Sequence, residues 1–183
     1  KNRSCNWILQ ISPETIGALA WLKKFENTAK NLDGVFVCTT CAGPGELGYK
    51  DAFNKNSRIS RAVRVAEQDL KRTLKYYPFI PDGSDERQFS SPGFRIPCIS
   101  ITKDKYYEYE QYHTSEDDLT FVSANNLFES LNFNWQVIKN LENDCKFIRN
   151  NKYGETKLGP LGLYPNISGH VNTESFNNQL NAL

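Results

Sequence analysis

The sequence predicts an α/β fold built on a mostly parallel sheet, and three apolar stretches carry that prediction. Trp7–Ile11 is typical of a short buried strand. A helical pattern follows it, and a second strand-like run, Val35–Thr39, follows the helix. Strand, helix and strand in this order favour a parallel pair joined by a right-handed crossover. Ile96–Ile101 predicts a further strand with polar loops at both ends.

The first helix is expected to begin directly after the first strand. Ser12 is a suitable N-cap, Pro13 fits the first helical position, and Glu14 falls in the first turn. The helix should run to about residues 29–31. Its core-facing side is formed by apolar residues at helical spacing, namely Ile16, Leu19, Ala20 and Leu22.

The residues between the second and third strands are predicted to form a loop, a helix and a loop. Ala42–Asn56 is rich in Gly, Pro and charge. Its glycines match the G-x-G-x-x-G spacing, but no apolar helix follows them in the right register. The match therefore does not indicate a phosphate-binding loop. Ile59–Leu74 predicts a helix whose basic side is solvated. Tyr76–Asp82 is expected to be an aromatic, Pro-punctuated loop.

A long helix, Ala124–Arg149, is predicted to pack back on the sheet. Its expected apolar stripe consists of Leu127, Leu131, Trp135, Ile138 and Leu141. The composition changes to Asn-rich loop chemistry after this helix. We therefore expect one domain over residues 1–150 and a linker with the start of a second, small domain over residues 151–183.

Composition excludes several classes of function. The 183 residues carry a net charge of +1, which gives no electrostatic reason to expect nucleic acid or an anionic membrane as partner. No apolar run approaches the roughly 20 residues of a membrane helix. The chain contains no Met. A cytosolic protein normally begins with one, so we expect this chain to be part of a longer gene product.

The five cysteines do not resemble a disulfide framework. Cys38 and Cys41 have the spacing of a redox or zinc pair, but no second pair accompanies them. The favoured interpretation is that the cysteines are buried thiols in a reducing cytosol, which predicts a cytoplasmic location.

Two polar clusters flank the Ile96–Ile101 strand, and ionisable loops at strand ends are where an α/β sheet builds a site. The clusters comprise Asp85, Glu86 and Arg87 before the strand, and Tyr112, His113, Ser115, Glu116 and Asp117 after it.

Each candidate has a structural and a functional interpretation. His113 is either a satisfied structural imidazole or a zinc ligand oriented by a nearby carboxylate. Glu14 either complements the helix dipole or acts as a general base or metal ligand. Arg87 could pair with Asp85 or Asp117 and fix its loop, or the acids of that loop could orient a histidine or accept a substrate amine.

The motifs resemble those of a known family. P-E-T-I-G with A-L-A-W-L (Pro13–Leu22), G-S-D-E-R-Q-F-S-S-P-G-F (Gly83–Phe94) and Y-H-T-S-E-D (Tyr112–Asp117) are similar to the aminopeptidase-like zinc exopeptidases of the bacterial leucyl aminopeptidase and glutaminyl cyclase type, including DUF4910-type proteins. G-E-T-K-L-G-P-L-G-L-Y-P (Gly154–Pro165) resembles the segment leading into their small C-terminal winged-helix domain. The matches cover about residues 7–169.

The resemblance implies a three-layer α/β/α fold with a zinc site at the carboxyl ends of parallel strands. His113 matches the family's last metal ligand, and Glu14 matches the glutamate that serves as base or ligand. Asp85 matches a supporting aspartate, while Glu86, Arg87, Tyr112 and Asp117 would lie around the ligands or substrate. The implied partner is a peptide or amide substrate.

The chain also departs from the family pattern. The family has two adjacent glutamates after the strand, whereas here Pro13 precedes Glu14. The family also has a metal-binding aspartate at a position that corresponds to about Thr40, where this chain has no carboxylate. One zinc ion is therefore expected rather than two. The family's first histidine and bridging aspartate would lie in an N-terminal half of the parent protein that this chain lacks. Without them, the isolated chain should be inactive.

Three functions remain open at this point. The first is a zinc-dependent aminopeptidase-like hydrolase acting on an amino-terminal peptide or related amide bond. The second is a non-catalytic binding or scaffold protein that keeps the exopeptidase fold. The third, glutaminyl-cyclase-like amide chemistry, would use the same site.

Overall fold

The computed structural model describes residues 4–144 together with residues 153, 154, 157 and 160. The expected domain boundary near residue 150 and the winged-helix-like segment fall outside these residues and stay predictions. No helix in the described part of the chain is both long and apolar enough to cross a bilayer.

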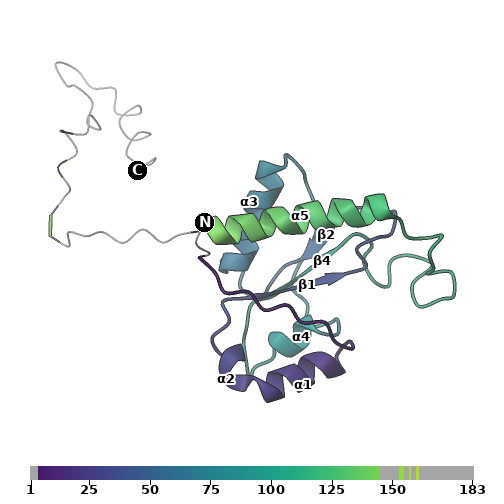
Figure 1. Cartoon of the computed structure of the whole chain (residues 1–183), viewed down its shortest axis with the longest axis horizontal. Coiled ribbons are helices and arrows are strands. Elements are labelled where there is room, and N and C mark those ends of the chain that lie inside the picture. Colours follow the sequence, from purple (N-terminus) through teal and green to yellow (C-terminus); the bar gives the residue numbers. More distant parts are fainter. Residues whose placement is uncertain (1–3, 145–152, 155–156, 158–159, 161–183) are drawn as a thin grey trace. The chain divides into compact units, whose positions relative to one another are not determined.

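A four-stranded mixed sheet lies at the centre of the fold, in the order β1-β4-β2-β3 (Figure 1). β1 (Val35–Thr39) pairs in parallel with β4 (Cys98–Thr102). β2 (Gly48–Lys50) runs antiparallel to β4, and β3 (Lys75–Tyr77) runs parallel to β2. The predicted α/β class is confirmed, with one antiparallel pair in the otherwise parallel sheet.

Two helices cover one face of the sheet, α3 (Arg58–Asp69) and α5 (Ala124–Asn143) (Figure 1). α3 begins at Ser57, whose side chain accepts the backbone N–H of Ser60, as expected of an N-cap. The main core lies between these helices and the sheet and includes Val63, Ile99, Ile101, Phe133 and Val137.

Three helices lie against the opposite face, where a smaller core forms (Figure 1). They are α1 (Ile16–Lys24), α2 (Glu26–Ala29) and α4 (Glu86–Phe89). The smaller core contains Ala18, Leu22, Ala29, Phe89, Ile96 and Cys98. Helices on both faces therefore bury both sides of β4, whose five residues are all buried.

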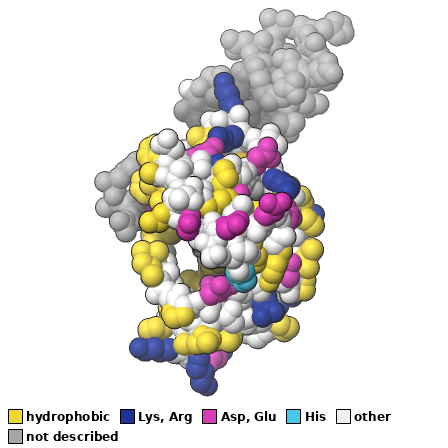
Figure 2. Space-filling model, turned by 90° about the vertical axis from the view of Figure 1, so that its right-hand side faces the viewer, with side chains coloured by type: hydrophobic (Ala, Val, Ile, Leu, Met, Phe, Trp, Pro, Cys, Tyr) yellow, Lys and Arg dark blue, Asp and Glu magenta, His cyan; other side chains and the backbone are white. Residues whose placement is uncertain are grey.

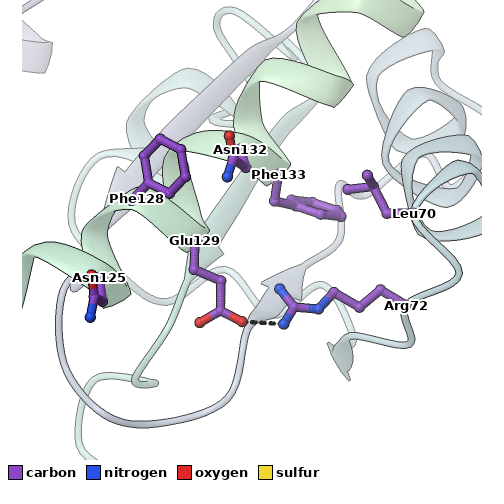
Figure 3. Close-up of a pocket in the computed structure, with 7 residues that line it drawn as sticks. All are labelled: Leu70, Arg72, Asn125, Phe128, Glu129, Asn132 and Phe133. Carbon is purple, nitrogen blue, oxygen red and sulfur yellow. Dashed lines mark ion pairs between the residues drawn. The ribbon is translucent and has the colours of Figure 1, made fainter.

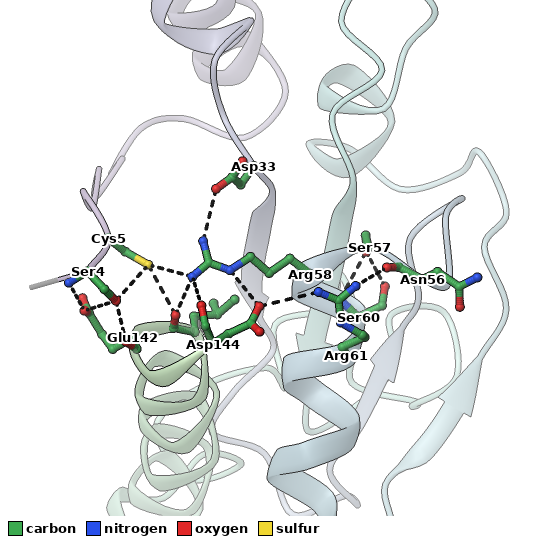
Figure 4. A network of polar contacts seen from close by, with 11 residues as sticks. Ser4, Cys5, Asp33, Asn56, Ser57, Arg58, Ser60, Arg61, Glu142 and Asp144 are labelled. Atoms are coloured by element: carbon green, nitrogen blue, oxygen red, sulfur yellow. Dashed lines mark hydrogen bonds and ion pairs between the residues drawn. The ribbon is translucent and has the colours of Figure 1, made fainter. Parts of the chain in front are cut away.

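A polar network ties the N-terminal segment to the end of α5 (Figure 4). The Arg58 guanidinium donates to the Asp144 carboxylate at 2.9 Å and to the Leu141 carbonyl at 2.7 Å. Ser4 donates its backbone N–H to the Glu142 carboxylate at 2.7 Å. Arg58 of α3 and Ser4 of the N-terminal segment are thus both bonded to the end of α5.

The prediction of a strand at Trp7–Ile11 is wrong. The segment forms no helix or strand in the described residues, and Leu9 and Ile11 are exposed. The expected parallel strand–helix–strand unit is therefore absent. The helix also starts later than expected: Thr15, with φ 59°, interrupts helical geometry, so α1 begins at Ile16 and Ser12 is not its N-cap.

Short elements were missed and two helix faces were assigned wrongly. In α1, Ile16, Leu19 and Ala20 are exposed, and the buried residues are Ala18 and Leu22. β2, β3 and α4 fall within predicted loops, because three- or four-residue elements carry too little periodicity to detect. In α5, Leu127, Leu131 and Trp135 are exposed, whereas Phe133 and Val137 are buried. The buried face is rotated by roughly a third of a turn from the predicted stripe.

The expectation of buried cysteines holds only in part. Cys98 is buried, Cys5 and Cys41 are half-buried, and Cys38 is exposed. Cys145 lies outside the described residues. Cys38 is exposed because β1 lies at the edge of the sheet.

Candidate functional site

Two segments that are far apart in the sequence meet at Asp85. The Asp85 carboxylate accepts the backbone N–H of Thr15 at 2.7 Å, across 70 residues of sequence. Thr15 has a positive φ and directly follows Glu14. The hydrogen bond therefore holds the backbone beside Glu14 against the loop that precedes α4.

A third segment lies close to Glu14. The rings of Tyr112 and His113 stack with centroids 3.9 Å apart. Burial, the neighbouring Tyr107 and the Glu14 carboxylate together raise the pKa of Tyr112. The direct contacts thus join Thr15 to Asp85 and Tyr112 to His113, and the charge of Glu14 acts on Tyr112.

The imidazole of His113 is accessible from solvent. Its backbone has φ 58°, in the left-handed region that few non-glycine residues adopt. Figure 2 shows a face of the molecule on which acidic and apolar side chains lie close together. Ligands and substrates could reach the exposed His113 side chain from solvent.

Glu86, by contrast, is part of a buried ion pair. Its carboxylate lies 2.7 Å from the Lys50 ammonium, and both side chains are at most 5% exposed. Lys50 also donates to the Asp82 carboxylate at 2.6 Å and to the Tyr106 hydroxyl at 2.8 Å. This arrangement places Glu86 beneath the loop and away from solvent, although the sequence grouped it with exposed site residues.

Opposing effects set the charges in this network. Burial alone would lower the pKa of Lys50, but hydrogen bonds with Asp82, Glu86 and Tyr106 raise it above its usual value. Burial alone would raise the pKa of Glu86, but the Lys50 ammonium holds it below its usual value. Burial also raises the pKa of Tyr106 to about 12. Lys50 and Glu86 are therefore ionised together.

The remaining predicted site residues lie at the surface. Asp117 accepts a hydrogen bond from the Tyr109 hydroxyl at 3.2 Å. Burial and this bond raise the pKa of Tyr109 to about 12. Arg87 is exposed, and it forms no ion pair with any described residue, so the pairing with Asp85 or Asp117 that the sequence suggested is not formed.

Sequence reasoning missed Asp104, a buried carboxylate just beyond the carboxyl end of β4. One carboxylate oxygen accepts the Gly45 N–H at 2.9 Å, and the other has no hydrogen-bond partner. Burial raises the pKa of Asp104. The only available signal was its position after an apolar strand, in a segment dominated by Lys and Tyr.

A surface pocket of about 350 Å³ lies elsewhere, between the start of α5 and the end of α3. It is lined by Leu70, Arg72, Asn125, Phe128, Glu129, Asn132 and Phe133 (Figure 3). An ion pair between Arg72 and Glu129 crosses it. The pocket contains none of the predicted site residues.

The described residues do not complete a zinc site by themselves. A carboxylate and an imidazole are suitable zinc ligands, but a catalytic zinc takes about three protein ligands. No group of three His, Cys, Asp or Glu side chains among the described residues could hold a metal ion. Glu14 and His113 would supply two.

Comparison with known proteins decides the family. A family model described as a domain of unknown function, DUF4910, matches residues 1–144. The chain belongs to the DUF4910 family. A relative from Clostridium acetobutylicum, provisionally named as a polysaccharide biosynthesis protein with an aminopeptidase-like domain, is 34% identical over 158 residues, which are 86% of this chain and 36% of that protein.

Solved structures show which fold this DUF4910 chain shares. A crystal structure of a protein provisionally named as a peptidase from Clostridium acetobutylicum matches 81% of this chain and 35% of that one, with a TM-score of 0.70 and 32% identity. An aminopeptidase from Aneurinibacillus sp. strain AM-1 matches with a TM-score of 0.53 and 22% identity, covering 70% of this chain and 29% of that one. The zinc aminopeptidase BSAP from Bacillus subtilis matches with a TM-score of 0.54 and 15% identity, covering 73% and 34%.

The resemblance inferred from the motifs is therefore confirmed at the level of family and fold. The DUF4910 chain spans about a third of the length of the relatives that it matches.

Proposed function

We propose that this chain contributes part of the active site of a zinc-dependent, aminopeptidase-like hydrolase that cleaves amino-terminal peptide or related amide bonds. One observation carries the proposal: the hydrogen bond from Thr15 to Asp85 holds the backbone beside Glu14 against the loop before α4, although 70 residues separate the two partners. The names of the relatives, which include peptidases and aminopeptidases, support the same class of reaction.

The residues take distinct roles in this proposal. Glu14 is the general base that accepts a proton from the attacking water and returns it to the leaving amine. Asp85 positions Glu14 through the Thr15 N–H. His113 is a metal ligand, and stacking against Tyr112 orients its ring.

A single zinc ion would need ligands beyond His113. We propose that these come from polypeptide outside the 183 residues, since the relatives are about three times as long as the matched region. The helices on both faces of the sheet are consistent with the three-layer arrangement of the exopeptidases. A C-terminal winged-helix-like segment and a cytoplasmic location stay predictions.

Two variants of the protein expressed from its complete reading frame test the proposal. Glu14→Gln should reduce kcat on aminoacyl-arylamides by about 10²- to 10⁴-fold while zinc remains bound. His113→Ala should lose zinc. Glu116→Gln is the matched control, because Glu116 is an exposed acid three residues from His113 and has no role in the site. It should keep both zinc and activity.

The absence of a three-ligand cluster in the described residues favours one alternative, a binding or scaffold protein that keeps the fold without the metal. Zinc-free wild-type protein without amidase activity would support that alternative and refute the hydrolase. Cyclised rather than hydrolysed products would indicate glutaminyl-cyclase-like chemistry at the same site.

A further inference from the structure

Cys38 and Cys41 lie at the carboxyl end of β1, in the sequence Cys-Thr-Thr-Cys. Cys38 is exposed and Cys41 is half-buried. Between them Thr40 adopts φ 45°, in the left-handed region that reverses the chain direction. The turn brings Cys41 back toward the strand that carries Cys38.

The surroundings of the two sulfur atoms differ. The Cys38 thiol faces α5 and donates to the Asn134 side-chain oxygen at 3.4 Å. The Cys41 thiol donates to the Thr39 carbonyl at 3.3 Å. A hydrogen bond from Cys41 lowers the pKa of Cys38, and the same pairing raises the pKa of Cys41. Cys38 therefore forms the thiolate more readily than Cys41.

We propose that Cys38 and Cys41 form a redox-active dithiol that exchanges with low-molecular-weight disulfides of the glutathione class. Three observations on the structure carry this proposal: the exposed position of Cys38, the left-handed backbone at Thr40, and the bonds of both cysteines to α5, Cys38 to Asn134 and the Cys41 carbonyl to Ser130 one turn earlier. The site is separate from the proposed hydrolase chemistry and does not depend on it.

The reaction has two steps. The Cys38 thiolate attacks one sulfur of the small disulfide, breaks its S–S bond and releases one thiolate, leaving a mixed disulfide on Cys38. Cys41 then loses its proton, attacks the Cys38 sulfur and releases the second thiolate. The protein loses two protons and two electrons, and one small disulfide becomes two thiols. A high-pKa thiol that becomes reactive only beside the mixed disulfide suits the resolving role of Cys41.

Mass spectrometry of the intact chain tests this directly. Trypsin cleaves after Lys30 and Lys50, so both cysteines fall in one peptide, residues 31–50. After incubation with oxidised glutathione and alkylation of remaining thiols, this peptide should be unalkylated and lighter by about 2 Da, the mass of two hydrogen atoms. Dithiothreitol should reverse the change. Cys98 is the internal control, because it is buried and should stay reduced in the folded chain.

Single variants separate the two roles. Cys41→Ser should accumulate glutathione on Cys38, because the resolving thiol is gone. Cys38→Ser should take up glutathione at Cys41 at least about tenfold more slowly, since thiolates react and protonated thiols do not. Circular dichroism shows whether each variant folds. Glutathione held stably by the wild-type peptide, independent alkylation of both thiols after oxidation, or equal uptake by the two variants would each overturn the proposal.

Discussion

Replacing Lys50 with methionine should destabilise the protein strongly, because it leaves the Glu86 carboxylate buried without its cation. The two side chains are 3% and 5% exposed, and their charged atoms lie 2.7 Å apart. Removal of one partner of a buried ion pair costs about 3–5 kcal/mol. The Tyr106 hydroxyl, which donates to Glu86 at 3.1 Å, would remain but cannot neutralise the charge.

The assay is urea unfolding followed by circular dichroism, which gives the free energy of unfolding of each variant. Lys75→Met is the matched control. Lys75 also forms an ion pair, with Glu108 at 2.8 Å, but these side chains are 52% and 46% exposed and solvent screens them. Its loss should change the free energy of unfolding little.

The cost of Lys50→Met should also depend on pH. In the wild-type chain, Lys50 holds the pKa of Glu86 below its unfolded value of 4.5, so the pair contributes stability above that pH and loses it as pH falls through the lower folded pKa. Without Lys50, Glu86 becomes protonated more easily. The difference between variant and wild type should therefore shrink on acidification. If Lys50→Met destabilised no more than Lys75→Met at pH 7, the charged network would not support the loop that carries Asp85.

Two further substitutions test the core at Phe133 and the buried carboxylate of Asp104, one oxygen of which has no hydrogen-bond partner. Phe133→Ala should cost about 3–5 kcal/mol, because Phe133 is 1% exposed, whereas Leu131→Ala, at 57% exposed, should cost much less; equal costs by urea unfolding would contradict the observed orientation of α5. Asp104→Asn keeps the Gly45 hydrogen bond but removes a buried charge. Since the folded pKa of Asp104 is raised from 3.8, Asp104→Asn should have a higher melting temperature than the wild-type chain at pH 7. This difference in melting temperature should vanish as pH falls through the raised pKa. A lower melting temperature of the variant at pH 7 would refute the reasoning.

Long elements and long motifs were the predictable part of this molecule. β1 matches the predicted strand at its ends, and β4 lies within two residues of its prediction. Both are apolar runs bounded by polar residues. α3 begins one residue before the predicted helix Ile59–Leu74 but ends five residues before its predicted end. The family followed from motifs of six or more residues, which carry more information than any local periodicity.

Other features depend on tertiary packing, which local sequence does not encode. α5 has apolar residues on two sides, so periodicity alone could not select the face that carries Phe133. Trp7–Ile11 has strand-like composition, but a strand also needs a pairing edge, and it has none among the described residues. Lys50 lies in a Gly-rich stretch, and nothing nearby in the sequence indicates that it would meet Glu86.

The candidate site also combines features that the sequence predicts with features that depend on tertiary packing. Glu14, Asp85 and His113 were chosen from sequence, and only the structure shows the hydrogen bond that joins Thr15, beside Glu14, to Asp85. Glu86 was adjacent to Asp85 in the sequence but faces the opposite way, into the buried network. Asp85 and Glu86, which are adjacent at the start of α4, thus have different surroundings and different partners.

The central claim, that His113 binds a zinc ion beside which Glu14 acts as the general base, is tested most directly by anomalous diffraction at the zinc edge. The experiment needs crystals of the protein expressed from its complete reading frame. We expect one peak about 2.0–2.1 Å from a His113 ring nitrogen, with Glu14 beside the ion and not bound to it. A zinc peak coordinated by other residues, or none in crystals grown with zinc, would contradict the claim.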